Sequence, residues 1–360
     1  MKKRPVLAII LALVMSLAAV FSFVGCGNDG KGESHPADDS FVGCLSAESY
    51  DSQDSAVRAF LTEELDGAAT QTTFVKAEEG EALSEEEIAQ LALGDAIDVN
   101  DIESAVHCTV TYTEEKITKV QTSADNDNKT YDLIIIKIGS LYFYYIPVMP
   151  KGGSITNSYI AMICDSSKYM NVTETTVSTT TSTVKGISVK VVLTATTKLA
   201  GDKAYLKMVL SIPIMQQTET EEYYLVTEND HLVTYAYSEY TNSWQRMGES
   251  NYTSLEQLMR EEMFKFDHSY FERIDSGFKM IDGKLEQFVS DVMSGQINSA
   301  AANLTVTKGS AYYYVKDARL DEVVVKLTMK GKADGENVTV SATARTRYSN
   351  FGTTEIDLPF

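Results

Sequence analysis

The sequence predicts an α+β protein with two domains, each built around antiparallel β-sheet. Three observations support this fold class. The 360 residues exceed one typical domain, and an apolar content of 44% is ample for packed cores. Apolar and polar residues alternate along many short runs, which is the period of half-buried strands. Helical runs precede the strands in residues 46–168 and interrupt them in residues 170–360, so we expect the strands to pair in antiparallel fashion.

The first residues have the features of a bacterial lipoprotein signal. Three basic residues open the chain, and residues 6–24 are almost wholly apolar. The stretch ends in Phe-Val-Gly-Cys at Cys26, which resembles a lipobox, where a peptidase cuts before a cysteine that carries a diacylglycerol. We therefore expect residues 1–25 to be a signal peptide and Cys26 to be the lipid attachment site. The protein would then lie at the cell membrane, lipid-anchored and facing outside the cytoplasm; an uncleaved anchor and plain secretion are the alternatives.

Residues 26–45 are rich in Gly, Asp and Ser, and we expect them to form a flexible tether. Cleavage before Cys26 removes three basic residues and no acidic ones, which takes the formal net charge from −20 to −23. Such an acidic chain lacks the clustered Lys and Arg that bind a phosphate backbone, so nucleic acid is not an expected partner. The membrane, reached through the lipid on Cys26, is the expected one.

Residues 46–168 are expected to form an N-terminal domain of helices followed by an antiparallel sheet. Residues 51–66 have the apolar stripe of a helix, and Ser84 and Glu87 match a capping box for a second, short helix. About four strands follow in residues 106–164. Helices followed by strands resemble the order of NTF2-like domains, a resemblance that rests on order alone.

Three cysteines remain after cleavage, so at most one internal disulfide can form. Cys108 and Cys164 both lie in strand-like apolar runs. Buried reduced thiols are the simpler expectation for these two residues, and a disulfide between them is the alternative.

Residues 170–360 are expected to form a C-terminal domain dominated by strands. Residues 172–184 are dense in threonine, and we interpret them as a first strand, with an extended linker as the alternative. Residues 187–240 alternate as two hairpins. Apolar helical stripes then begin near Ser254 and near Leu285, and further strands complete the domain.

The order of these elements carries a family resemblance. Antiparallel strands lead to a Tyr-rich hairpin that closes on Trp244, and helices and further strands lead to a terminal Asn-x-Gly…Ile-x-Leu-Pro segment at Pro359. This order looks like that of the LolA/LprG-type lipoproteins, although their opening helix is replaced here by the Thr-rich strand. The resemblance implies a curved half-barrel with helices on its concave side and acyl chains held between them. The cavity would be lined by Ile187, Val189, Val191, Leu193, Leu206, Met208, Leu210, Leu285, Phe288, Val289 and Val292.

The same apolar stripes also build ordinary closed cores, which have the same sequence pattern as a ligand cavity. Six methionines of this half of the chain suit an adaptable pocket and fill ordinary gaps equally well. The choice between a cavity and a closed core therefore stays open from sequence.

The sequence contains no complete motif for a catalytic or metal-binding site. The four histidines are scattered, and HExxH, GxSxG and phosphate-binding glycine loops do not occur. Ser182 and Lys185 match SxxK, but its companion motifs stand in the wrong order and Ser182 lies in a strand-like run. Asp125 opens an incomplete calcium loop in which Thr130 replaces the required glycine. We therefore expect no catalytic residue, no metal and no cofactor.

The sequence thus leaves three functional hypotheses. The first is a non-catalytic, membrane-anchored lipoprotein that binds a lipid or another hydrophobic ligand in the C-terminal half-barrel. The alternative is a cell-surface interaction module that binds protein, peptide or glycan through exposed aromatic residues, such as the run from Tyr142 to Tyr145. The third, an enzyme, would need a cleft in which titratable groups converge.

Overall fold

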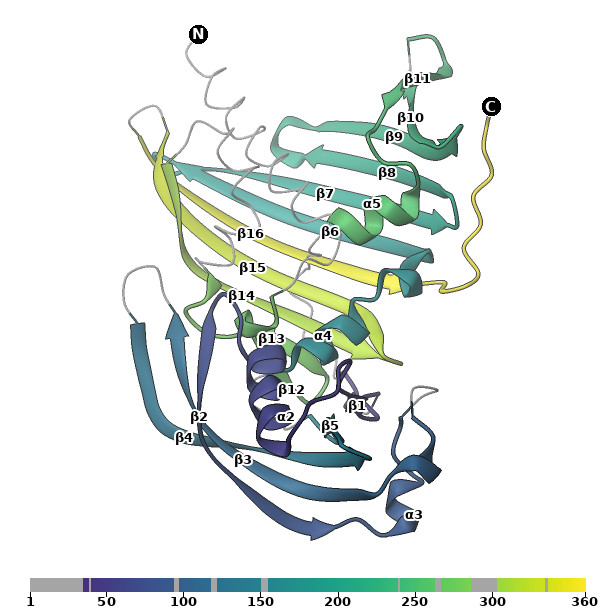
Figure 1. The fold of residues 1–360 in the computed structure, drawn as a ribbon. Helices are drawn as coiled ribbons and strands as arrows, with labels where there is room; N and C mark the ends of the chain where they lie inside the picture. Colours follow the sequence, from purple (N-terminus) through teal and green to yellow (C-terminus); the bar gives the residue numbers. More distant parts are fainter. Residues whose placement is uncertain are drawn as a thin grey trace. The chain divides into compact units, whose positions relative to one another are not determined.

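The computed structural model describes residues 35–360 apart from 39, 94–96, 118–121, 150–154, 239, 263–266, 286–302 and 334–335. The chain divides into two compact units (Figure 1). The small unit contains residues 36–163 and 266–281. The large unit contains His35, residues 164–265 and residues 282–360. The predicted domain limits of 46–168 and 170–360 stay a prediction; the units differ from them mainly in that residues 266–281 belong to the small unit.

The small unit begins with a helix, as the sequence predicts. Helix α2 (Gln53–Phe60) is capped by Ser52, whose hydroxyl accepts from the backbone N–H of Ser55 at 3.2 Å, and continues as the π-helical turn η1 (Leu61–Leu65). The side chains of Val57 and Phe60 are fully buried. The expected capping box is present at α3 (Glu85–Ile88), where Ser84 and Glu87 exchange hydrogen bonds. Local capping and one apolar stripe therefore determine both helices.

An antiparallel sheet of five strands, ordered β1-β5-β4-β3-β2, follows these helices. Its long strands β3 and β4 match the strands expected after residue 106, whereas β2 was not expected because its sequence is mostly polar and exposed. A helix, α4 (Asn157–Ile163), replaces an expected strand near the end of this run. A hairpin of β12 (Phe271–Ile274) and β13 (Gly277–Met280) completes the unit. The sheet strands are β1 (Cys44–Leu45), β2 (Thr70–Ala82), β3 (Ser104–Ile117), β4 (Thr122–Ile138) and β5 (Leu141–Ile146).

The large unit is built on nine antiparallel strands in the order β11-β10-β9-β8-β7-β6-β16-β15-β14. The Thr-rich run forms the central strand β6, which pairs with β7 and β16 along its whole length. The described strands form an open sheet and not a closed barrel. The strands are β6 (Asn171–Val184), β7 (Ile187–Ala200), β8 (Lys203–Ile212), β9 (Gln217–Glu228), β10 (His231–Ser238), β11 (Ser243–Glu249), β14 (Asn303–Lys316), β15 (Arg319–Ala333) and β16 (Glu336–Ser349).

Short helices accompany this sheet. They are the 3-10 turns η3 (Ser166–Tyr169) and η4 (Pro213–Met215) and the helix α5 (Leu255–Glu262), which contacts β9 and η3. Leu255 and Met259 of α5 are buried, as expected from the stripe that begins near Ser254.

The register of the strands divides the large sheet into two faces. Leu193 lies opposite both Ser178 and Leu210, and these residues share what we call the apolar face. Tyr205 lies opposite Tyr224, on what we call the polar face. Because successive side chains of a strand point to opposite sides, these pairs fix the faces of the other residues wherever neighbouring strands pair without a bulge.

Two further findings bear on the sequence predictions. Cys44, Cys108 and Cys164 are free thiols, so the alternative of a Cys108–Cys164 disulfide is wrong. Within the described residues, none of the helices has the length and the apolar character needed to cross a membrane. The signal sequence and its lipid attachment site Cys26 lie outside the described residues.

Candidate functional site

The centre of the apolar face is a cluster of side chains from β7 and β8. Val191, Leu193, Leu210 and Ile212 are buried, and Val189 and Met208 pack against them. Leu193 and Leu210 are direct cross-strand partners, which explains why residues distant in sequence meet here. The structure therefore brings together five of the seven sheet residues predicted to line a cavity, and it adds Ile212.

The other predicted residues fall in different places. Ile187 is 62% exposed, because it stands beside the Lys185-Gly186 turn at the end of β7. Leu206 is half-buried on the apolar face. Leu285 is buried and packs against the backbone at Gly309 of β14, so closely that a Cβ atom at position 309 would collide with its Cδ2. Phe288, Val289 and Val292 lie outside the described residues.

Strand β6 runs beside this cluster and contributes hydroxyl groups to the same face. Ser178, Thr180 and Ser182 are all buried, between valine and leucine residues of β7 and small or apolar residues of β16. Among the described residues, the Ser182 hydroxyl has no hydrogen-bond partner. A buried hydroxyl without a partner costs free energy, so its site is one where a ligand group could supply the missing bond. The sequence predicted the strand but not this feature.

On the far side of β6, strands β16 and β15 continue the apolar face. Val340, Ala342 and Ala344 of β16 are buried. The next strand, β15, adds the buried residues Val323, Val325, Leu327 and Met329. Small side chains of β6 and β16 thus lie between larger apolar side chains on both sides.

One end of the apolar face carries a buried carboxyl group. Glu174 lies directly across from Tyr348 and accepts a hydrogen bond from the Thr176 hydroxyl at 3.2 Å. Burial raises the pKa of Glu174 to about 7, and burial also raises the pKa of Tyr348 well above its ordinary value. Glu174 is therefore poised to be neutral in mildly acidic solution and to donate or accept a hydrogen bond at the end of the apolar strip.

The polar face has a charged cluster beside a pocket of about 560 Å³. Glu322 is buried and lies 3.0 Å from the Nε2 atom of His35, 3.0 Å from Nε of Arg345 and 2.7 Å from Nε of Arg347. The His35 ring stacks on Tyr314 with centroids 3.5 Å apart. Cross-strand pairing accounts for the cluster, since Glu322 of β15 is opposite both Arg347 and Tyr314. Two guanidinium groups on one carboxylate make an ion-pair network.

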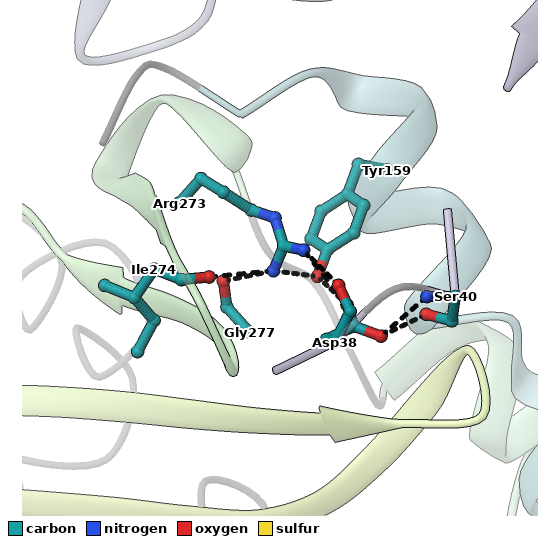
Figure 2. A network of polar contacts seen from close by, with 6 residues as sticks. All are labelled: Asp38, Ser40, Tyr159, Arg273, Ile274 and Gly277. Carbon is teal, nitrogen blue, oxygen red and sulfur yellow. Dashed lines mark hydrogen bonds and ion pairs between the residues drawn. The ribbon is translucent and has the colours of Figure 1, made fainter. Parts of the chain in front are cut away.

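The small unit has a buried polar network of its own (Figure 2). Arg273 donates to the Asp38 carbonyl at 2.7 Å, and its guanidinium lies 3.4 Å from the Asp38 carboxylate. Tyr159 donates to the same carboxylate at 2.8 Å, and Arg273 also donates to the carbonyls of Ile274 and Gly277. Asp38 falls within the predicted flexible tether, yet it is buried here because this network holds it.

Within the described residues, no group of three or more His, Cys, Asp or Glu side chains could hold a metal ion. Among these arrangements the apolar face of the large sheet is the candidate site, because it combines buried apolar side chains with the Ser182 hydroxyl and the Glu174 carboxyl group.

Comparisons with known proteins give little further information. No family model matches the sequence, and no curated protein matches it. Among solved structures, a DUF1329 family protein from Desulfovibrio piger ATCC 29098 is similar over 54% of this chain and 95% of its own, at 9% identity and a TM-score of 0.21. A likeness this weak carries no argument, so the LolA/LprG resemblance stays a prediction.

Proposed function

We propose that this chain is a non-catalytic lipoprotein, anchored outside the cytoplasm through Cys26, which binds a lipid or similar hydrophobic molecule on the apolar face of the large unit. In this proposal the sheet is a half-barrel with helices on its concave side, and the apolar face is that side. The alternating burial that places Val191, Leu193 and Leu210 together on one face is the observation that carries the proposal.

The chemistry of the apolar face suits an acyl chain. Each methylene removed from water contributes about 0.8 kcal/mol, so a chain of ordinary length needs no covalent bond to be held. The strip of Ser178, Thr180 and Ser182 runs along the face between larger apolar residues, and the Ser182 hydroxyl could bond one polar group of the ligand. Glu174 at the end of the strip could bond a second.

A pair of adjacent valines provides the test. Val191 points into the apolar face and Val192 to the polar face, because neighbouring strand residues alternate. Val191→Trp should fill the ligand space, whereas Val192→Trp should leave it unchanged. We expect organic extraction of the purified full-length protein, followed by mass spectrometry, to recover non-covalent lipid from the wild type and from V192W.

The expected result for V191W is a clear loss of extracted lipid at unchanged circular dichroism. The covalent lipid on Cys26 stays with the protein during extraction, so it does not obscure the result. Recovery of no lipid from the wild type, or equal loss from both valine variants, would contradict the proposal.

A further inference from the structure

The polar face of the large sheet carries an aromatic cluster that the proposed lipid site does not use. Tyr205, Tyr224 and Tyr235 lie in one cross-strand row over β8, β9 and β10, because each is the direct partner of the next. Trp244 of β11 is opposite Tyr237 of β10 on the same face. We call these five residues, with Phe360, the aromatic platform.

The rings of the aromatic platform contact one another closely. The centroid of Tyr224 lies 4.9 Å from that of Tyr205 and 4.6 Å from that of Trp244. Trp244 is 5.5 Å from Tyr237. Phe360 stacks on Tyr235 with centroids 4.2 Å apart.

The platform is open to solvent although it is aromatic. Phe360 is 52% exposed and Tyr237 is 39% exposed, while Tyr205, Tyr224, Tyr235 and Trp244 are half-buried. Exposed groups of large apolar side chains of this kind mark interaction sites on soluble domains. Tyrosine and tryptophan suit such sites because one part of the ring is apolar and another part is polar.

Polar groups surround the rings and define the chemistry of a partner. Tyr205 donates to Glu222 at 2.9 Å, and Tyr235 donates to Glu228 at 2.8 Å. Tyr237 donates to the Asn242 side chain. Carboxylate, amide and hydroxyl groups therefore lie at the ring edges, where a ligand rich in hydroxyl groups would find both donors and acceptors.

The charges beside the rings argue against a charged partner. Lys207 pairs with Glu222 at 2.8 Å, and Arg246 pairs with Glu249. Arg246 is also the direct cross-strand partner of Tyr235, so a positive charge stands within the row itself. A cationic peptide would meet Arg246 and Lys207, and an anionic ligand would meet Glu222 and Glu228.

We propose that the aromatic platform binds a neutral polysaccharide. Its sugar rings would stack their C–H faces on the aromatic rings, and their hydroxyl groups would bond the carboxylate and amide groups at the edges. This site is on the opposite face of the sheet from the proposed lipid site, so either can exist without the other.

The test is native affinity electrophoresis of the full-length protein in mild detergent, in gels that contain hydroxyethylcellulose, pullulan or galactomannan. The exposed rings Tyr237 and Phe360 are replaced singly by alanine. Tyr240→Ala is the matched control, because Tyr240 is 98% exposed and makes no ring contact in the described part of the chain.

We expect at least one polysaccharide to retard the wild type and Y240A equally. Y237A and F360A should each weaken the interaction about tenfold, since loss of one central aromatic contact commonly costs that much. Absence of retardation in all three gels overturns the proposal. The proposal is also overturned if neither Y237A nor F360A reduces the retardation, or if Y240A reduces it as much as they do. Binding to a basic peptide resin but to none of the polysaccharides would overturn it as well.

Discussion

At the scale of single residues, the structure buries ionisable side chains in two different ways. Glu174 is buried on an apolar face, where it accepts a hydrogen bond from the neutral Thr176 hydroxyl, so burial destabilises its charged form. Asp38 is buried in contact with the guanidinium of Arg273 and the hydroxyl of Tyr159. The pH dependence of stability should therefore report on the burial of Glu174, and removal of Arg273 should report on the buried ion pair of Asp38.

Glu174→Gln should remove a pH dependence of stability. The pKa of Glu174 rises from 4.5 to about 7 on folding, so the folded state holds a proton that the unfolded state has lost between these values. Stability should therefore fall as the pH rises from about 4.5 to about 7, by on the order of 3 kcal/mol for this group.

Urea unfolding at about pH 5 and at about pH 8 measures this effect. The difference between the two pH values should be smaller in E174Q than in the wild type by most of that amount. Equal pH dependence of the two proteins would show that Glu174 ionises as freely when folded as when unfolded.

Arg273→Met should destabilise the small unit strongly. The variant leaves the Asp38 carboxylate buried without its positive partner, and breaking a buried pair in this way costs about 3–5 kcal/mol. Lys76→Met is the control, because Lys76 pairs with Glu78 in an exposed bridge 2.9 Å long that should contribute about 0–1 kcal/mol. Urea denaturation of both variants gives the comparison, and equal losses of stability would contradict the interpretation of Figure 2.

At the scale of elements, the central strand β6 shows what the sequence could and could not predict. Its Thr and Val content favours a strand, and the structure confirms that interpretation over a linker. Its hydrogen bonds could not be predicted, because they depend on pairing with β16, about 170 residues later in the chain. Thr176 bonds Thr346 at 2.7 Å, whereas the Ser182 hydroxyl is unpaired among the described residues.

These two hydroxyls of β6 should respond differently to removal. Ser182→Ala removes a buried group that has no partner, so stability should be unchanged or higher by about 1 kcal/mol. Thr176→Ala removes one partner of a buried hydrogen bond and should cost about 1–3 kcal/mol. Thermal unfolding of the two variants tests this order, and a larger loss in S182A would contradict it.

Part of the candidate site can be predicted from the sequence, because alternation along a strand is a local pattern. Alternation along β7 and β8 predicts that Val189, Val191, Leu193 and Leu210 share one face, and they cluster in the structure; that they line a cavity stays a prediction. Ile187 follows the same alternation but is exposed, because burial ends where the strand meets its turn. The burial of Glu174 is not predicted, since an acidic residue in a Thr-rich run gives no sign of burial. Its spacing of two and four residues from Thr176 and Ser178 is the signal that places it on the same face of the strand.

At the scale of the whole molecule, we propose that a lipid anchor at Cys26 is joined to a folded body whose large sheet has two opposite faces. Residues 26–45 were expected to form a tether, and the described part of that segment is tied to the small unit at Asp38 and at β1. The anchor should therefore hold the folded body closer to the membrane than a 20-residue flexible linker would.

Lipidation should occur at Cys26 and not at Cys44, although both cysteines follow the sequence Ser-Phe-Val-Gly. Only Cys26 follows an apolar stretch, and Cys44 belongs to strand β1. A bacterial host fed a labelled fatty acid should label the wild type and the Cys44→Ser variant but not the Cys26→Ser variant. Label that persists in C26S, or that is lost in C44S, would contradict this assignment.

Native mass spectrometry of the wild-type chain expressed from residue 27, without its covalent lipid, tests the central claim most directly. If the apolar face of the large sheet binds a hydrophobic molecule, the folded protein should carry an added mass that matches a lipid and disappears on denaturation. A single mass equal to that of the polypeptide, in protein that is still folded, would contradict the claim that this face binds a lipid.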